Sequence, residues 1–152
     1  MHRFAAAAWF FYASVLFASP FTCSTRDGGN EAIRSNATEA VFLSELRQLP
    51  QKRTGTGENG EYAVSVENVG TGAVCSVSAT ETKGRYRIDI LYYKTEPTYY
   101  GFGRDVEVPR RRAYSVKGKE AVKKVFRTFF QGNTEAWLAE VDRLDVIVYS
   151  KY

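Results

Sequence analysis

The sequence predicts an α+β protein in which helices pack on one face of an antiparallel sheet of about five strands. Apolar residues recur at helical spacing in 37–49 and again in 119–131. Between these segments they alternate with polar residues from 61 to 93, and Gly-containing turns interrupt the alternation. We therefore expect a single α+β domain over 37–152, with an N-terminal helix and a C-terminal amphipathic helix on the same face.

The first two dozen residues have the pattern of a secretory signal peptide. A basic start, Met1-His2-Arg3, precedes an uncharged apolar run over 4–18, and small residues follow it. A retained membrane anchor is the alternative, but such a helix needs about 20 apolar residues, and Pro20 would break its last turn. We therefore expect residues 1–24 to hold a cleaved signal peptide and the protein to be secreted, hence extracellular.

The cut point decides the fate of the two cysteines, Cys23 and Cys75. Cleavage after Ala18 retains Cys23, and an oxidising compartment then allows one Cys23–Cys75 disulfide, which we favour. Cleavage after Ser24 removes Cys23 and leaves Cys75 as a small buried apolar residue. We expect residues 25–36 to form a flexible lead.

The first helix is predicted over 37–49, where Pro50 stops the helical pattern. Just before it, Asn36-Ala37-Thr38 is an N-glycosylation sequon, and Asn36 is a surface acceptor if the host is a eukaryote. Asn36 could equally cap the helix, because Glu39 follows three residues later.

A polar, Gly-rich loop is expected over 51–60. Its Lys52-Arg53 pair fits a kexin-like processing protease, and a cut after Arg53 would make the first helix a propeptide. Three alternating segments follow the loop and are joined by short turns, which predicts an antiparallel meander. These segments are 61–69, 73–82 and 85–93.

The region after the meander is less regular. We expect Thr95-Glu96-Pro97 to break the sheet and 99–103 to form a strand or an aromatic loop. Arg110-Arg111-Arg112 is interpreted as an exposed turn before a short strand at 113–116, and a last strand is expected over 144–149.

The clearest helix covers 119–131, where the apolar residues form one continuous stripe. Gly132-Asn133 fits a C-terminal cap. Thr134 is placed to cap a short second helical turn that carries Trp137.

Histidine chemistry is excluded from the mature chain, because the only histidine is His2, inside the predicted signal. Two cysteines cannot build a metal site alone, so neither a metal nor a cofactor is expected. A carboxylate-based hydrolase remains an alternative to a non-enzymatic protein. Its candidate acids are Glu58, Glu61, Glu67, Glu81, Asp89, Asp105 and Glu107.

Positive charge is concentrated between Arg104 and Arg127, which carry nine Lys or Arg against three acidic residues, whereas the whole chain is only +4. An anionic partner such as nucleic acid or anionic lipid would explain this concentration, and an ordinary solvated helix face is the alternative. The candidate basic patch consists of Arg110, Arg111, Arg112, Lys119, Lys123, Lys124 and Arg127.

Aromatic residues supply a second candidate surface. Tyr86 and Tyr92 share the expected core face, so Tyr93 points outward with Leu91. Tyrosine is favoured at protein interfaces, which predicts a protein-binding patch unless the Tyr-Gly-Phe-Gly stretch closes the core. The candidate aromatic patch consists of Leu91, Tyr93, Tyr99, Tyr100 and Phe102.

As a class, the chain resembles the small secreted effectors of filamentous plant pathogens. It shares their signal peptide, short single domain, few cysteines and lack of a catalytic signature. Phe21-Thr22-Cys23 is similar to a motif of mildew effectors with a ribonuclease-like fold, although this chain has no catalytic histidine and its second cysteine, Cys75, lies mid-chain. The resemblance implies a virulence effector that binds and modulates a host protein.

Residues 99–137 resemble one family of bacterial toxin-immunity proteins. The resemblance rests on Tyr99-Tyr100-Gly101, Arg104-Asp105, Val108-Pro109, Phe129-Phe130-Gln131-Gly132 and Trp137. It implies a protein that binds and blocks a toxin. Members of that family stay in the cytosol, whereas the start of this chain predicts export.

The sequence therefore predicts a secreted, monomeric, non-enzymatic binding protein whose partner is a host protein. The alternatives are a binder of nucleic acid or anionic lipid through the basic patch, and a toxin-neutralising protein.

Overall fold

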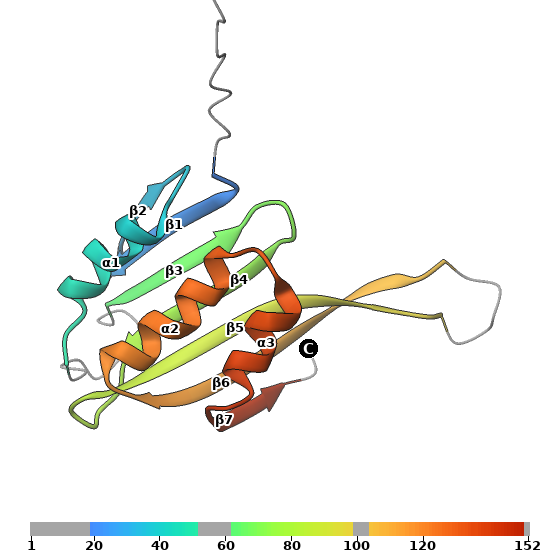
Figure 1. Cartoon of the computed structure of the whole chain (residues 1–152). Helices are drawn as coiled ribbons and strands as arrows, with labels where there is room; N and C mark the ends of the chain where they lie inside the picture. The colour runs from blue at the N-terminus through green and yellow to red at the C-terminus, as the bar shows by residue number, and fades with distance from the viewer. Residues whose placement is uncertain (1–18, 52–61, 99–103, 151–152) are drawn as a thin grey trace, which may run out of the picture.

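Seven strands form one antiparallel sheet in the computed structural model, which describes residues 19–51, 62–98 and 104–150 (Figure 1). The strand order is β2-β1-β3-β4-β5-β6-β7. The strands are β1 (Phe21–Asp27), β2 (Asn30–Arg34), β3 (Ala63–Asn68), β4 (Ala73–Ala79), β5 (Arg85–Glu96), β6 (Val106–Lys117) and β7 (Asp145–Ser150). The helices are α1 (Glu39–Gln48), α2 (Lys119–Phe130) and α3 (Thr134–Val141). The predicted α+β class is confirmed, with seven strands instead of about five.

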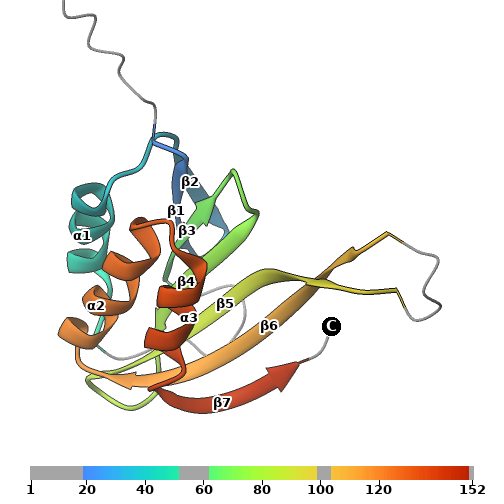
Figure 2. The same cartoon turned by 45° about the vertical axis from the view of Figure 1, so that its right-hand side comes forward.

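All three helices cover the same face of the sheet (Figures 1 and 2). Aromatic side chains fill the space between the layers: the rings of Phe42 on α1 and Phe126 on α2 stack with their centroids 3.9 Å apart. Phe129 on α2 meets Trp137 on α3 at 4.6 Å, and Phe21 on β1 meets Phe130 at 4.9 Å. Close packing of these rings holds the helices in register with the strands.

The helix boundaries follow from local capping groups. Thr38, not Asn36, caps α1, because its side chain accepts a hydrogen bond from the Val41 N–H. At the other end of the chain, Gly132 adopts a φ of +74° after α2, as the predicted C-terminal cap requires. Asn133, rather than Thr134, then caps α3 by accepting from the Ala136 N–H.

The prediction of a flexible lead over 25–36 is wrong, because strands occupy most of this segment. Residues up to Asp27 belong to β1, which pairs with both β2 and β3, and β2 follows after a Gly28-Gly29 turn. Every residue of β2 is exposed, so its sequence carries no alternation of polar and apolar residues. An edge strand that buries no side chains cannot be recognised from the periodicity of apolar residues in the sequence.

The Cys23–Cys75 disulfide is also corrected, because both cysteines are free and buried in the structure. Val66 on β3 pairs with Cys23 on one side and with Cys75 on the other. Neighbouring strands lie about 4.8 Å apart, so the two Cα atoms are separated by about 10 Å, beyond the roughly 7 Å limit for a disulfide. Burial raises the pKa of both thiols, that of Cys23 to about 11.

Within the described ranges, no helix has the length and apolar character needed to cross a membrane. Residues 1–18 of the predicted signal segment lie outside these ranges, and so does the Arg53 processing site, whereas 19–24 are described and include the start of β1.

Candidate functional site

The most prominent feature outside the core is a two-stranded arm formed by residues 92–96 of β5 and 106–110 of β6 (Figure 1). The two strands pair continuously from Arg85–Lys117 to Glu96–Val106. β4 accompanies β5 only as far as Leu91, and β7 accompanies β6 only as far as Arg111. The arm therefore extends past the sheet, and within the described residues both of its outer edges lack a neighbouring strand.

Two sequence-based predictions are wrong in this region. Thr95-Glu96-Pro97 does not break the sheet at Thr95, because β5 continues to Glu96. Arg110-Arg111-Arg112 is not a turn but lies within β6. Thr95 and Glu96 lie in the two-stranded arm, where no further layer covers them. Arg110 and Arg112 lie on the helix side and pair with carboxylates, so neither segment shows the apolar alternation that marks a half-buried strand.

The root of the arm is anchored to α3 on the helix side of the sheet. The Arg112 guanidinium lies 5.5 Å from the centre of the buried Tyr92 ring and donates to Asp142 Oδ1 at 2.8 Å. The Tyr114 hydroxyl donates to the same oxygen at 3.2 Å. Burial raises the pKa of Tyr114, so this phenol stays a proton donor. The cluster fixes the direction in which the arm leaves the sheet.

An ion pair between Arg110 and Glu96 joins the two strands further along the arm. It lies on the same side as Tyr92, since Arg110 pairs with Tyr92 across the ladder. This cross-strand pair replaces the packing that a neighbouring strand would otherwise provide.

On the opposite side of the sheet the arm presents Tyr93, of which 42% is exposed, next to the half-buried Leu91. The predicted outward orientation of Tyr93 and the burial of Tyr86 and Tyr92 are confirmed. The Tyr93 ring rests on the β3–β4 turn, where a Cβ added to Gly72 would lie only 3.1 Å from Cε2. Gly72 also has a φ of +69°, so glycine both permits the turn and leaves room for the ring.

Of the candidate aromatic patch, the structure brings Leu91 and Tyr93 together on one face of β5. Tyr99, Tyr100 and Phe102 lie outside the described residues, so their part in the patch stays a prediction.

The candidate basic patch is divided between two elements and two faces. On β6, Arg110 and Arg112 point to the helix side and are paired with carboxylates, whereas Arg111 points to the other side. Alternation along a strand separates neighbours in this way. The three consecutive arginines therefore do not form one surface.

On α2 the basic side chains connect the helices. Arg127 pairs with Glu39 on α1 at 3.0 Å, and Lys124 pairs with Glu140 on α3 at 3.0 Å. Lys123 pairs with Glu120 at 2.6 Å within the helix. These ion pairs give the basic residues of α2 a structural role that was not evident from the sequence.

Lys119 at the start of α2 has a different kind of partner. Its ammonium group donates to the carbonyl oxygen of Leu49 at 2.8 Å, at the C-terminal end of α1. Burial and the neighbouring Lys123 lower the pKa of Lys119. A cation at this position satisfies carbonyl groups that the helix leaves without partners.

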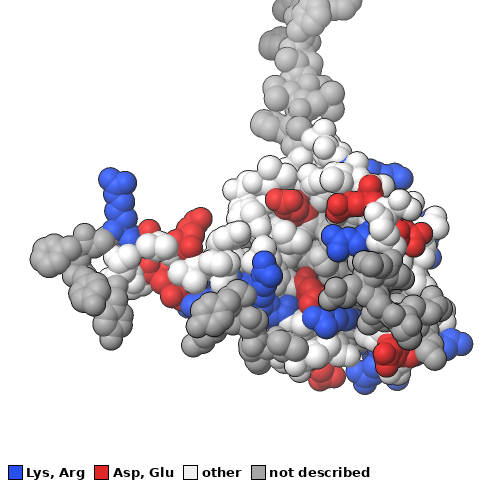
Figure 3. Space-filling model, turned by 180° about the vertical axis from the view of Figure 1, so that it is seen from behind, with Lys and Arg blue, Asp and Glu red and all other residues white. Residues whose placement is uncertain are grey.

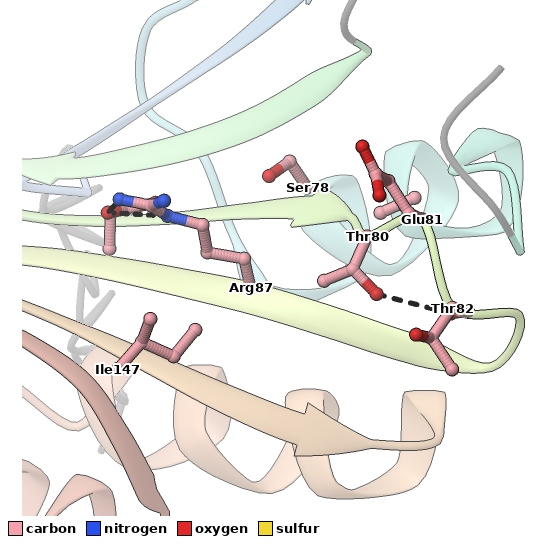
Figure 4. A pocket seen from close by; sticks show the side chains of 8 residues that line it. Ser78, Thr80, Glu81, Thr82, Arg87 and Ile147 are labelled. Atoms are coloured by element: carbon pink, nitrogen blue, oxygen red, sulfur yellow. Dashed lines mark hydrogen bonds and ion pairs between the residues drawn. The ribbon is translucent and has the colours of Figure 1, made fainter. Parts of the chain in front are cut away.

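The helix-free face of the sheet carries side chains of both charges, with no large area of one sign in its described part (Figure 3). An open hollow of about 570 Å³ lies on this face, and several of its side chains are drawn in Figure 4. Its lining residues are Ser78, Ala79, Thr80, Glu81, Thr82, Arg87, Asp89 and Ile147. Sequence reasoning did not find it, because Ile147 is far from the other residues along the chain.

Two of the candidate hydrolase acids, Glu81 and Asp89, line this hollow. Arg87 holds Asp89 in place through hydrogen bonds of 2.8–3.0 Å to both carboxylate oxygens. Glu58 and Glu61 lie outside the described residues, and the other candidates lie elsewhere on the surface.

Among the described residues, no group of three His, Cys, Asp or Glu side chains is placed to hold a metal ion.

The sequence matches no protein-family model and no curated protein, and the structure matches no solved structure.

Proposed function

We propose that the protein is a secreted, monomeric binding protein that engages a partner protein through the arm, without catalysing a reaction. The observation that carries the proposal is the projection of β5 and β6 beyond their neighbours, with unpaired backbone edges and the exposed side chain of Tyr93. Unpaired strand edges accept an added strand, and tyrosine is a frequent anchor of interfaces.

The outer edge of β5 is the better docking edge. Residues 92–96 contain no proline, whereas Pro109 removes a backbone donor from the corresponding part of β6. Lys94 and Glu96 on the β5 edge disfavour uncontrolled strand-to-strand aggregation. Their charges therefore support a protein that is monomeric in the absence of a specific partner.

Export after cleavage at Ala18 is part of the proposal. A cut there leaves β1 whole, whereas a cut after Ser24 would remove Phe21 and Cys23 from the core. The whole of β1 is needed between β2 and β3, so the earlier cut is the one compatible with this fold.

Processing after Arg53 would not by itself release the first helix. The segment before Arg53 contains β1, which pairs with β3 along six residues, and Phe42, which stacks on Phe126. It would therefore stay bound to the rest of the domain as a non-covalent strand and helix.

A host protein is our first choice of partner, and a toxin is the second, because blocking a toxin would use the same arm. The basic patch gives less support for a nucleic-acid or anionic-lipid partner, since six of its seven side chains have carboxylate or carbonyl partners within the protein. Asn36 is exposed, which suits it as a glycosylation acceptor.

Affinity capture with the Tyr93→Ala variant tests the proposal. The matched control is Ile33→Ala, because Ile33 is 64% exposed and lies on β2 at the far edge of the sheet. Extracts of host tissue and of toxin-bearing bacteria serve as separate sources. We expect recovery of the partner to fall about tenfold or more for Tyr93→Ala and to stay unchanged for Ile33→Ala. Equal recovery with both variants would remove the arm from the proposal.

A further inference from the structure

The hollow is a second candidate binding site, independent of the arm. It lies over β4, the β4–β5 turn and the first half of β5, and Ile147 of β7 bounds it from the opposite side (Figure 4). Its volume of about 570 Å³ is in the range of small-ligand sites. The arm begins only at Tyr92, beyond the β5 residues that line the hollow.

Part of the wall is held rigid by its own hydrogen bonds. The Thr80 hydroxyl lies 3.1 Å from the carbonyl oxygens of both Thr82 and Arg85, which fixes the turn. Arg87 donates to both carboxylate oxygens of Asp89 through Nε and Nη2, with three N–O distances of 2.8–3.0 Å. These groups are already ordered before a ligand binds. Binding would therefore cost little conformational entropy.

The charges of the lining argue against an anionic ligand. Glu81 and Asp89 outnumber the one basic residue, Arg87, whose charge is opposed by Asp89 at hydrogen-bond distance. A phosphate or sulfate group would meet a net negative wall. The hydroxyl and carboxylate groups equally disfavour a purely apolar ligand, because they would lose water without gaining a partner.

The hydroxyl and carboxylate oxygens of the lining, set beside one apolar side chain, suit a neutral, polyhydroxylated ring. Ser78, Thr82 and Glu81 supply hydroxyl and carboxylate oxygens on the β4 side. Ile147, 46% exposed, supplies an apolar surface on the other side. A pyranose sugar has the same two-sided character, with hydroxyl groups at its rim and C–H groups on its faces.

We propose that the hollow binds a neutral pyranose unit of an oligosaccharide. The Asp89 carboxylate, oriented by Arg87, accepts hydrogen bonds from the sugar hydroxyls, and Ile147 packs against the C–H face of the ring. A carboxylate held by an arginine presents its remaining lone pairs in a fixed direction, which suits pairs of adjacent hydroxyl groups.

Titration of the ¹⁵N-labelled protein with cellotetraose, chitotetraose and mannotetraose, each to about 10 mM, tests the proposal, with inositol hexaphosphate as the anionic probe. That concentration exceeds the approximately millimolar Kd expected for a few hydrogen bonds in an open site. We expect saturable shifts of amide signals in 78–82 and 87–89 with at least one neutral sugar. Shifts with none of them, or with the anionic probe alone, would overturn the proposal.

Two exposed positions on β7 give a matched pair of variants. Ile147→Ser should weaken sugar binding about tenfold, the change expected for losing one apolar contact, whereas Val146→Ser should leave it unchanged. Val146 is 38% exposed, pairs with Tyr114 and does not line the hollow. Equal affinity for both variants would overturn the assignment. Neither variant should alter partner capture by the arm, so the two proposals fail separately.

Discussion

β5 and β6 form one continuous ladder, yet its two halves have different surroundings. In the first half, from Arg85 to Leu91, the strands have neighbours on both edges and helices over one face. In the arm, beyond the buried Tyr92, the described part of the same two strands has neither (Figure 2). Residues such as Ile88, which is fully buried, stabilise the fold, whereas Tyr93 contributes little to the core. The same ladder therefore stabilises the fold mainly through its first half, and the far part of the arm is left accessible to the partner that we propose.

The largest expected effect is the difference in stability between the two halves. Phe126→Ala removes a fully buried ring that stacks on Phe42 and should lower the free energy of unfolding by about 3–5 kcal/mol. Tyr93→Ala should lower it by only about 1 kcal/mol, because the side chain is 42% exposed and lies outside the buried core. Urea denaturation measures both values. Similar losses for the two variants would mean that the arm is part of the core.

The buried thiols make the stability of the core depend on pH. Below about pH 8 the thiols are mostly protonated in both the folded and the unfolded state. At higher pH the thiol of the unfolded chain ionises first, because burial raises the pKa of Cys23 in the folded protein to about 11. Stability should therefore fall between about pH 9 and pH 11, by up to about 2 kcal/mol for this group, and Cys23→Ala should flatten the fall.

Thiol labelling checks the same point independently. Folded protein should react with Ellman's reagent at neither Cys23 nor Cys75 at pH 8, and unfolded protein should react at both. If the protein unfolded without reductant did not react with the reagent, the two cysteines would be joined in a disulfide. That result would contradict the strand register.

A smaller effect is expected at the root of the arm. Asp142→Ala leaves the buried Tyr114 hydroxyl without this acceptor and should cost about 1–2 kcal/mol. It should also speed amide exchange in 92–96, because Arg112 loses its link to α3. The control is Arg143→Ala, next in the chain, which breaks only an exposed pair with Glu140. Equal exchange in both variants would show that Asp142 does not anchor the arm.

The smallest effect belongs to the basic side chains of α2. Arg127→Ala should lower the free energy of unfolding by about 0.5 kcal/mol or less, since its pair with Glu39 is largely exposed. The loss should shrink further in salt. Binding of heparin or anionic vesicles that falls steeply with Arg127→Ala would instead favour the anionic-partner hypothesis.

The sequence predicted those elements that bury a face. The alternation of Tyr86 and Tyr92 with Tyr93, and the stripe on α2, placed the core correctly because burial imposes a period on the sequence. β2 and the arm bury few side chains, so the sequence shows no such periodicity in these segments. The disulfide was mispredicted because only strand register reveals that Val66 separates the two cysteines.

The candidate sites were predictable only in part, for a related reason. Leu91 and Tyr93 were found together because they lie two residues apart on one strand. The basic residues were grouped by their nearness in sequence, and their carboxylate partners come from other elements. The hollow joins Ser78 to Ile147, a pairing that only the folded sheet creates.

Hydrogen exchange of the complex with the captured partner tests the role of the arm most directly. We predict that binding slows the exchange of amides in 92–96, and that amides in β2, at the far edge of the sheet, exchange as in the free protein. Protection confined to β2, to α2 or to the hollow, with the arm unchanged, would contradict the account.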